Sequence, residues 1–193
     1  EVGAGCGSFT RNYFNEKFTS ITLTEKDEEN FLKLSKKYKE NEKVKVINEL
    51  IYDINHQYNA ILYLHVLEHI KDDKKEIDEA IRKLKKNGHL IIMVPAHQKI
   101  YSNLDKEVGH FRRYESDFFK QEMKFLKLVN FKYLDSAGYL LYKLNSFVFR
   151  TEKSPTKLKI FIWDKFFTPL SLIFDFILMY KFGKCILAIY KKD

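Results

Sequence analysis

The distribution of apolar residues along the first two thirds of the chain predicts short buried strands separated by helices. Four apolar runs have the length of strands: ITLTE (Ile21 to Glu25), VKVIN (Val44 to Asn48), NAILYLH (Asn59 to His65) and GHLIIMVP (Gly88 to Pro95). Between them, KDEENFLKLSKKY and DDKKEIDEAIRKLKKN show helical spacing, with acidic starts and basic ends that suit the helix dipole. This alternation predicts a parallel sheet with right-handed crossovers, in which ligands bind at the carboxyl ends of the strands.

The pattern changes after Pro95. A polar, aromatic segment (AHQKIYSNLDKEVGHFRRYES) leads into a predicted helix over Ser116 to Leu128 and a strand over Phe131 to Ala137. The remaining predictions are two strongly apolar helices and a closing strand: Leu140 to Arg150, Lys157 to Lys181, and Cys185 to Lys192. The sequence contains no internal repeat and no linker long enough to mark a domain boundary, so we expect a single domain over residues 1–193.

Composition narrows the class of protein. The chain has 193 residues, of which 45% are apolar and 16% aromatic, which is typical of a globular domain. Cys6 and Cys185 lie far apart in the sequence and show no metal-ligand spacing, and no signal-peptide pattern is present, so we expect a cytoplasmic setting. The net charge of +8 would suit nucleic acid or an anionic membrane. Because the lysines are scattered over the predicted helices, we expect no nucleic-acid partner.

The opening EVGAGCGSFT raises the question of a nucleotide site. Glycines at Gly3, Gly5 and Gly7 allow positive φ and let backbone N–H groups approach a ligand closely. A glycine turn at the start of a doubly wound sheet gathers backbone donors for a nucleotide. The spacing is G-x-G-x-G, preceded by Glu1, and differs from the G-x-G-x-x-G of dinucleotide-binding proteins. An acidic residue at the end of the predicted strand Ile21 to Glu25, Glu25 itself, could accept both hydroxyls of a ribose.

Three stretches together resemble the class I S-adenosylmethionine-dependent methyltransferases. The E-x-G-x-G-x-G opening resembles their first motif, and YNAILYLHVLEHIKDD with LKKNGHLIIMVP resembles the fourth-strand and fifth-strand signatures of the small-molecule members. The segment that ends in GHFRRY (Gly109 to Tyr114) and the terminal GKCILAIYKK are similar to relatives of the ubiquinone-type O-methyltransferases. Departures from the family pattern are Asn59 in place of an aspartate and Asn87-Gly88 in place of a double glycine.

The resemblance implies a Rossmann-like, doubly wound α/β fold with a seven-stranded, mostly parallel sheet, an antiparallel last strand and an apolar helical insertion before that strand. It places the cofactor-binding core and substrate loop in residues 1–139, the insertion in 140–182 and the last strand in 183–193. Since family members begin with a helix and a complete first strand, we expect the chain to be truncated at its N-terminus.

The resemblance also implies a cofactor, S-adenosylmethionine, with S-adenosylhomocysteine as the product. Residue by residue, the three glycines would surround the methionine portion, and Glu1 would hold the loop or the cofactor ammonium. Glu25 would bind the ribose, and His65 would lie beside the methionine portion. For the adenine we expect Glu49, with Asp53 as the second choice; solvated loop carboxylates are the alternative for both.

Two histidines are candidates for a catalytic base, His110 and His69. Histidine titrates near neutrality and can take a proton from an acceptor that must lose one, although a histidine in VLEHI can also simply anchor its loop. Acceptor contacts are expected from four residues of the loop: Tyr101, Arg112, Arg113 and Tyr114. Arginines offer a rigid fork to a carboxylate or phosphate, but arginines paired with carboxylates of a neighbouring helix would look the same in sequence. No cluster has convincing metal spacing, so we expect no metal.

The apolar insertion has the least usual composition. Residues 157–181 are long enough for a membrane span, but Asp164, Lys165, Pro169 and Asp175 interrupt them, so we predict no span. Three uses remain open: packing on the core or on a homodimer partner, a lid over a greasy substrate, and insertion into one leaflet with flanking lysines at the headgroups.

The function that we predict is methyl transfer to a small or lipid-like acceptor, on oxygen, by in-line displacement in a cytoplasmic protein that can contact the inner membrane face. The alternatives are a non-catalytic, membrane-associated binding protein of the same fold and a nucleic-acid methyltransferase. A nucleic-acid methyltransferase would need an N/D-P-P-Y/F type of motif after the family's fourth strand, which corresponds to Asn59 to His65. This chain has His65-Val66-Leu67-Glu68 there.

Overall fold

The first two predicted strands form a small parallel sheet. The structure is a computed structural model that describes residues 1–13, 18–121, 123, 125–148, 165, 166 and 168–193. Strands β1 (Ile21–Thr24) and β2 (Val44–Ile47) pair in parallel and are joined by helix α2 (Glu28–Tyr38). The helix begins at Asp27, whose carboxylate accepts the N–H of Asn30, and it packs the fully buried Leu34 against the strands.

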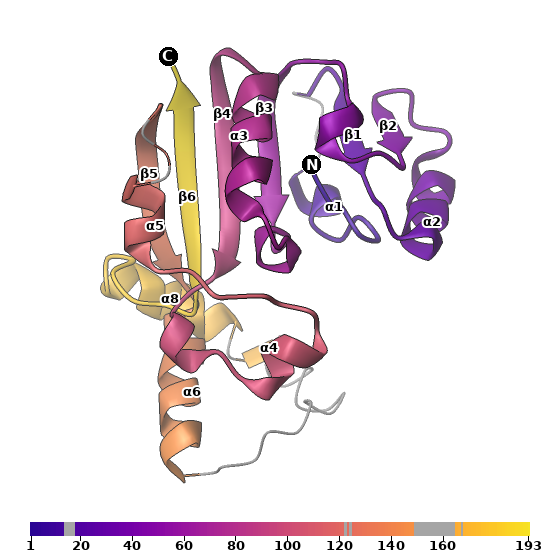
Figure 1. The fold of residues 1–193 in the computed structure, drawn as a ribbon. Helices are drawn as coiled ribbons and strands as arrows, with labels where there is room; N and C mark the ends of the chain where they lie inside the picture. Colours follow the sequence, from indigo (N-terminus) through magenta and orange to yellow (C-terminus); the bar gives the residue numbers. More distant parts are fainter. Residues whose placement is uncertain (14–17, 122, 124, 149–164, 167) are drawn as a thin grey trace.

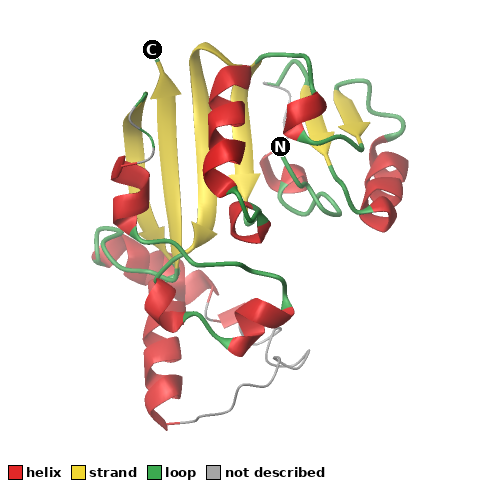
Figure 2. Ribbon diagram, viewed as in Figure 1, coloured by secondary structure: helices red, strands yellow, loops and turns green. Residues whose placement is uncertain are grey.

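A larger sheet follows, with the strand order β3-β4-β6-β5 (Figures 1 and 2). Strand β3 (Tyr58–Leu64) runs parallel to β4 (Leu84–Pro95), and helix α3 (Asp73–Lys83) connects them across one face. Strand β6 (Cys185–Lys192) lies antiparallel between β4 and β5 (Leu126–Leu134), as predicted for the last strand. The core consists of alternate residues of these strands, such as Leu90, Ile92 and Ile186, together with Ile77 of α3.

The first residues of the chain connect the two sheets. The N–H of Val2 donates to the carbonyl of Leu62 in β3, and the N–H of Thr24 in β1 donates to the carbonyl of Glu1. Val2 forms only an isolated bridge with Tyr63, so the described residues hold six strands, and the prediction of a seven-stranded sheet was wrong in this respect. The short segment nevertheless occupies the place between β1 and β3, which brings its glycines to the carboxyl ends of both strands.

Two element boundaries differ from the predictions because strand pairing outweighs local helical spacing. The helix predicted over Ser116 to Leu128 is α5 (Ser116–Gln121), which is shorter, and Leu126 and Leu128 belong to β5, where they pair with β6. Strand β4 begins at Leu84 rather than Gly88, with a register shift opposite Tyr58 and Ala60 that accommodates the additional residues.

The described part of the apolar insertion contains α6 (Ser136–Val148) and α8 (Thr168–Ile177); residues 149–164 and 167 of the predicted helices lie outside the described residues. The carboxylate of Asp175 in α8 accepts the N–H groups of Asp135 and Ser136, at 2.9 and 2.8 Å, and the hydroxyl of Ser171 donates to Asp135. Polar residues on this apolar helix therefore serve to dock it on the first turn of α6.

Two segments that contain predicted site residues follow the carboxyl ends of β3 and β4. Helix η2 (Leu67–His69) follows β3, and a long loop with η3 (Gln98–Ile100) and α4 (Asn103–Glu107) follows β4. Figure 1 shows α4, α6 and α8 beyond the end of the sheet toward which the arrows of β3 and β4 point. Smaller elements are α1 (Thr10–Tyr13) and η1 (Ile51–Asp53). None of the described helices is long and apolar enough to cross a membrane.

Candidate active site

The glycine loop has the backbone conformation that its sequence predicts. Gly3, Gly5 and Gly7 have φ values of 62°, 57° and 71°, which a side chain would strain. A Cβ on Gly7 would lie 2.7 Å from Leu34, and one on Gly3 would lie 3.0 Å from the methyl groups of Val66. A Cβ on Gly5 would meet nothing within 4 Å. Packing therefore restricts the side chain at two of the glycines, whereas Gly5 faces open space.

Glu25 links this loop to the end of β1. Its carboxylate accepts the N–H of Gly5 at 2.6 Å and the N–H of Asp27 at 2.8 Å. The residue is 8% exposed. A carboxylate has about four acceptor positions, so the two backbone bonds leave capacity for the hydroxyls of a ribose. The structure thus brings Glu25 to the glycine loop, although its role as a ribose ligand stays a prediction.

Glu1 holds the loop from the other side. Its carboxylate accepts the hydroxyl of the buried Thr10 at 2.6 Å, across the turn that contains the three glycines. This contact favours the first of the two roles predicted for Glu1, which was support of the loop.

The two carboxylates predicted for the adenine, Glu49 and Asp53, are both exposed. Glu49 lines a hollow with residues near the starts of three strands, including Ile21, Lys43 and Tyr58. The described contacts therefore do not bring Glu49 to the glycine loop, and its adenine role is supported by sequence resemblance alone.

The segment between β3 and η2 connects the glycine loop to the histidines. Val66 touches the position of Gly3, and the ring of His65 stacks on Phe9 with centroids 6.1 Å apart. His65 has a positive φ of 58°, and its Nδ1 donates to Glu68 over 3.3 Å. Burial opposes protonation of His65, but hydrogen bonds with Cys185 and Glu68 raise its pKa to about 10. His65, which the resemblance places beside the methionine portion, therefore adjoins the residue that contacts the glycine loop, Val66.

An ordered pair, Asp105 and His110, lies in the loop after β4. Nδ1 of His110 donates to Asp105 at 2.9 Å, and Nε of Arg113 donates to the same oxygen at 2.9 Å. Burial opposes ionisation of Asp105, but the hydrogen bonds from Arg113 and His110 hold its pKa below the usual range. Because the carboxylate only accepts, the proton of a neutral His110 is on Nδ1, and Nε2 carries the free lone pair.

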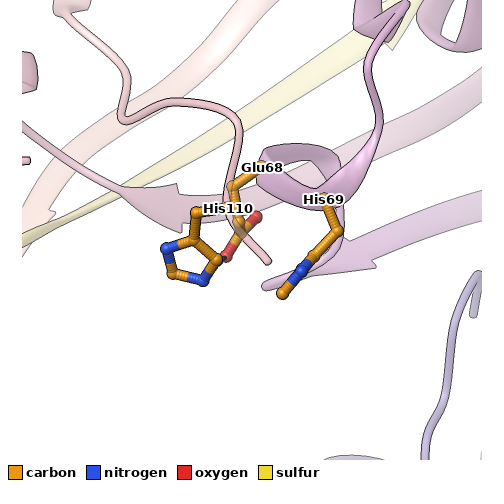
Figure 3. Close-up of side chains that lie close together, drawn as sticks. All are labelled: Glu68, His69 and His110. Carbon is orange, nitrogen blue, oxygen red and sulfur yellow. Dashed lines mark ion pairs between the residues drawn. The ribbon is translucent and has the colours of Figure 1, made fainter. Parts of the chain in front are cut away.

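That lone pair faces η2. Nε2 of His110 lies 4.0 Å from a carboxylate oxygen of Glu68, and the rings of His69 and His110 meet edge to face with centroids 4.7 Å apart (Figure 3). Burial lowers the pKa of His69, and the neighbouring His110 contributes in the same direction. The two histidines predicted as bases are therefore adjacent, at the end of β3 that also carries the contact with Gly3.

All four predicted acceptor residues make internal contacts. Arg112 pairs with Asp73 of α3 at 2.6 Å, and the hydroxyl of Tyr114 donates to the same carboxylate at 2.8 Å. Tyr114 is 2% exposed and belongs to the core, and Arg113 is the partner of Asp105. Both arginines are therefore paired with carboxylates, which is the alternative that the sequence left open. Their contacts with an acceptor stay predictions. The hydroxyl of Tyr101 donates to the carbonyl of His110 and supports that loop.

Two functional candidates were absent from the predicted site, Glu68 and Asp105. Glu68 is completely buried. No local pattern in VLEHI reveals this burial, because it depends on the loop after β4, where the N–H of Phe111 donates to the carbonyl of Glu68. Asp105 lies five residues before His110 in the same segment. Because spacing along a loop does not show which side chains meet, this was only a weak signal of their contact.

Comparison with known proteins decides the family. A family model described as a methyltransferase domain matches residues 1–134, which is more than half of the chain. The chain belongs to this methyltransferase family. It is an S-adenosylmethionine-dependent methyltransferase of class I with a Rossmann-like α/β fold, as the sequence motifs indicated. A search of curated proteins gave no match.

Solved methyltransferase structures share the fold at low sequence identity. The N-methyltransferase NodS from Bradyrhizobium japonicum WM9, in complex with S-adenosylhomocysteine, is 12% identical with a TM-score of 0.59, over 99% of this chain and 75% of NodS. A putative sarcosine dimethylglycine methyltransferase from Galdieria sulphuraria is 13% identical with a TM-score of 0.65, over 100% and 77%. An S-adenosylmethionine-dependent methyltransferase from Clostridium acetobutylicum ATCC 824 is 14% identical with a TM-score of 0.62, over 99% and 82%.

Proposed function

We propose that this methyltransferase transfers a methyl group from S-adenosylmethionine to the oxygen of a small or lipid-like acceptor held between η2 and the loop of residues 101–114. The proposal is supported by two neighbouring features: a glycine loop with open space at Gly5, and His110, which Asp105 orients in the loop after β4. Val66 lies against Gly3 and begins the segment that carries Glu68 and His69, so the two parts share one short stretch of chain.

The residues at the glycine loop fit the cofactor. Gly5 leaves room for it, the Glu25 carboxylate has acceptor capacity for ribose hydroxyls, and the loop is fixed by Glu1 and Thr10 before any ligand binds. S-Adenosylmethionine, when bound, supplies a methyl group on a sulfonium sulfur. The contribution of the chain is to hold an acceptor atom in line with that carbon, which accounts for much of the acceleration in such displacements.

A hydroxyl acceptor must lose its proton, and we propose His110 as the general base that accepts it. Its Nε2 has no hydrogen-bond partner among the described residues, Asp105 accepts from Nδ1, and Arg113 in turn holds Asp105. A carboxylate that orients a histidine and stabilises its cation is a familiar aid to general-base catalysis. Amine acceptors are the second candidate, since NodS and the Galdieria protein carry N-methyltransferase or amino-acid methyltransferase names.

A calorimetric titration of S-adenosylhomocysteine into the full chain tests the cofactor assignment, with NAD as the control ligand. We expect saturable binding of S-adenosylhomocysteine and none of NAD, because the glycine spacing and Glu25 suit a single ribose. Transfer of labelled methyl groups to a panel of phenols and primary amines would then identify the acceptor atom. Binding of NAD in preference to the thioether nucleoside would contradict the assignment.

The apolar insertion is the second part of the proposal: α8 rests on a membrane surface where a lipid-like acceptor resides. Large apolar side chains of α8 and the turn after it are exposed, namely Leu172, Ile173, Phe176, Ile177 and Met179. Lys181 and Lys184 follow, and the net charge is +8. Between α6 and α8 there is also a cavity of about 350 Å³ lined by Leu140, Leu170, Phe174 and Phe182, which suits an apolar chain.

Flotation with liposomes tests this surface. We expect the protein to float with anionic vesicles, and Phe176→Ser to reduce the bound fraction at least about threefold, because burial of a large apolar side chain contributes about 1.5–3 kcal/mol. The matched control is Leu32→Ser on α2, where a similarly exposed side chain lies on a different part of the surface. Equal losses for both variants, or a stable dimer without vesicle binding, would contradict membrane contact.

A further inference from the structure

One of the two carboxylate oxygens of the buried Glu68 has no hydrogen-bond partner among the described residues. Its residue exposure is 0%, one carboxylate oxygen accepts from His65, and the other, Oε2, has no hydrogen-bond partner among the described residues. Burial of a charged oxygen without a partner is costly. In the described part of the chain, other buried carboxylates of comparable exposure are held by two or more donors, as Glu25 and Asp175 are. One oxygen of Glu68 therefore lacks the second donor that those carboxylates have, which leaves an acceptor position for a cation.

Two imidazole rings lie beside the same carboxylate. One ligand atom from each of Glu68, His69 and His110 lies within 4.8 Å of the others, and the three side chains converge from η2 and the loop after β4 (Figure 3). Two histidines and a carboxylate form a typical three-residue set for a catalytic zinc ion, with a fourth position open. Ligand atoms around tetrahedral zinc lie about 3.3 Å apart, so small rotations of His69, which is exposed, and His110 would close the set.

The surroundings of His110 strengthen the inference. A histidine that ligates a metal commonly donates its other ring N–H to a carboxylate, which fixes the tautomer and orients the ring. His110 donates Nδ1–H to Asp105, and Asp105 is itself fixed by Arg113 and by the N–H and hydroxyl of Ser102. Nε2 of His110, which has no hydrogen-bond partner among the described residues, faces Oε1 of Glu68 at 4.0 Å, the oxygen that also accepts from His65.

We infer that Glu68, His69 and His110 bind a divalent transition-metal ion of the zinc class, with Asp105 as the positioning residue of His110. The open position would take the acceptor oxygen. A bound cation lowers the pKa of such an oxygen, so its proton passes to solvent water; the oxygen then accepts the methyl group, while the sulfonium sulfur keeps the bonding electrons and becomes a thioether. In that form His110 acts as a ligand instead of the base. This acceptor role rests on the proposed function, whereas cation binding does not.

Metal titration of the full chain, without a polyhistidine tag and after dialysis against a chelator, tests the site. We expect one equivalent of Zn²⁺ to bind by calorimetry, Co²⁺ to give the visible absorption of a tetrahedral site, and Mg²⁺, which prefers oxygen ligands, to bind far more weakly. Glu68→Gln and His69→Gln should each remove the Co²⁺ spectrum. Asp105→Asn should weaken Zn²⁺ about 10–100-fold. His56→Gln, an exposed histidine on another part of the surface, is the matched control.

The outcomes separate this site from the cofactor assignment. His69 is exposed, so its variant is expected to fold even if loss of the buried Glu68 carboxylate disturbs the structure. No binding of Zn²⁺ or Co²⁺, or equal weakening by His56→Gln and His69→Gln, would overturn the metal site. S-Adenosylhomocysteine binding is measured on the same chelator-treated sample, so a failure of the metal site leaves the methyltransferase proposal intact, and the reverse also holds.

Discussion

Glu25→Ala is expected to abolish measurable binding of S-adenosylhomocysteine while the protein remains folded. The substitution removes the acceptors of two backbone N–H groups, those of Gly5 and Asp27, and the predicted acceptors of the ribose hydroxyls. Hydrogen bonds to charged groups contribute about 1.5–3 kcal/mol each, so the loss of two from the complex predicts a weakening of at least about 100-fold. Isothermal calorimetry of wild type and variant measures the change directly.

The control for this prediction is Glu28→Ala, which removes an exposed carboxylate three residues further along the chain and is expected to bind S-adenosylhomocysteine as wild type does. Glu25→Gln keeps one acceptor oxygen and should lie between wild type and Glu25→Ala. Thermal unfolding of each variant establishes that the protein is folded at the temperature of the titration. Wild-type affinity in folded Glu25→Ala would contradict the ribose role and leave Glu25 as a loop anchor only.

Gly5→Ala and Gly7→Ala are expected to fail in different ways although they make the same chemical change two residues apart. Gly7→Ala places a methyl group 2.7 Å from Leu34 of α2 at a φ of 71°. Left-handed strain of about 1–2 kcal/mol and overpacking of about 1–3 kcal/mol predict a loss of about 2–5 kcal/mol in the free energy of unfolding. Urea denaturation followed by circular dichroism measures this loss.

Gly5→Ala introduces the same left-handed backbone strain but no steric clash, since nothing lies within 4 Å of its Cβ. Its unfolding free energy should fall by only about 1–2 kcal/mol, whereas S-adenosylhomocysteine should bind roughly tenfold or more weakly, because the methyl group occupies the space that faces the ligand. Each variant serves as the control of the other. An undiminished affinity of folded Gly5→Ala would show that the cofactor does not approach the loop at this position.

Much of the fold followed from the sequence because the relevant signals are local. The period of the apolar runs located β1, β2, β3 and β6, and the acidic starts and basic ends located α2 and α3. Positive φ at the three glycines could also be expected from residue type. The family motifs identified the methyltransferase class, since these motifs combine the glycine turn with the strand that follows it.

Other features depended on contacts between distant segments and could not be read from local spacing. Leu126 and Leu128 fit the apolar spacing of a helix, but pairing with β6 makes them part of a strand. Asp175 interrupts an apolar run for no evident local reason, and only the first turn of α6 explains it. Asp73 of α3 binds both Tyr114 and Arg112, a contact that no spacing along the chain indicates.

The sequence by itself determined the class of enzyme, the order of its elements and the conformation of the glycine loop, because residue type and period carry that information. The tertiary structure alone decided which side chains meet at the carboxyl ends of β3 and β4. Glu68 and His69 follow β3, Asp105 and His110 follow β4, and these pairs meet only because parallel strands deliver their carboxyl ends to one edge of the sheet. Distances between side chains 40 residues apart are set by that packing, and no spacing along the chain encodes them.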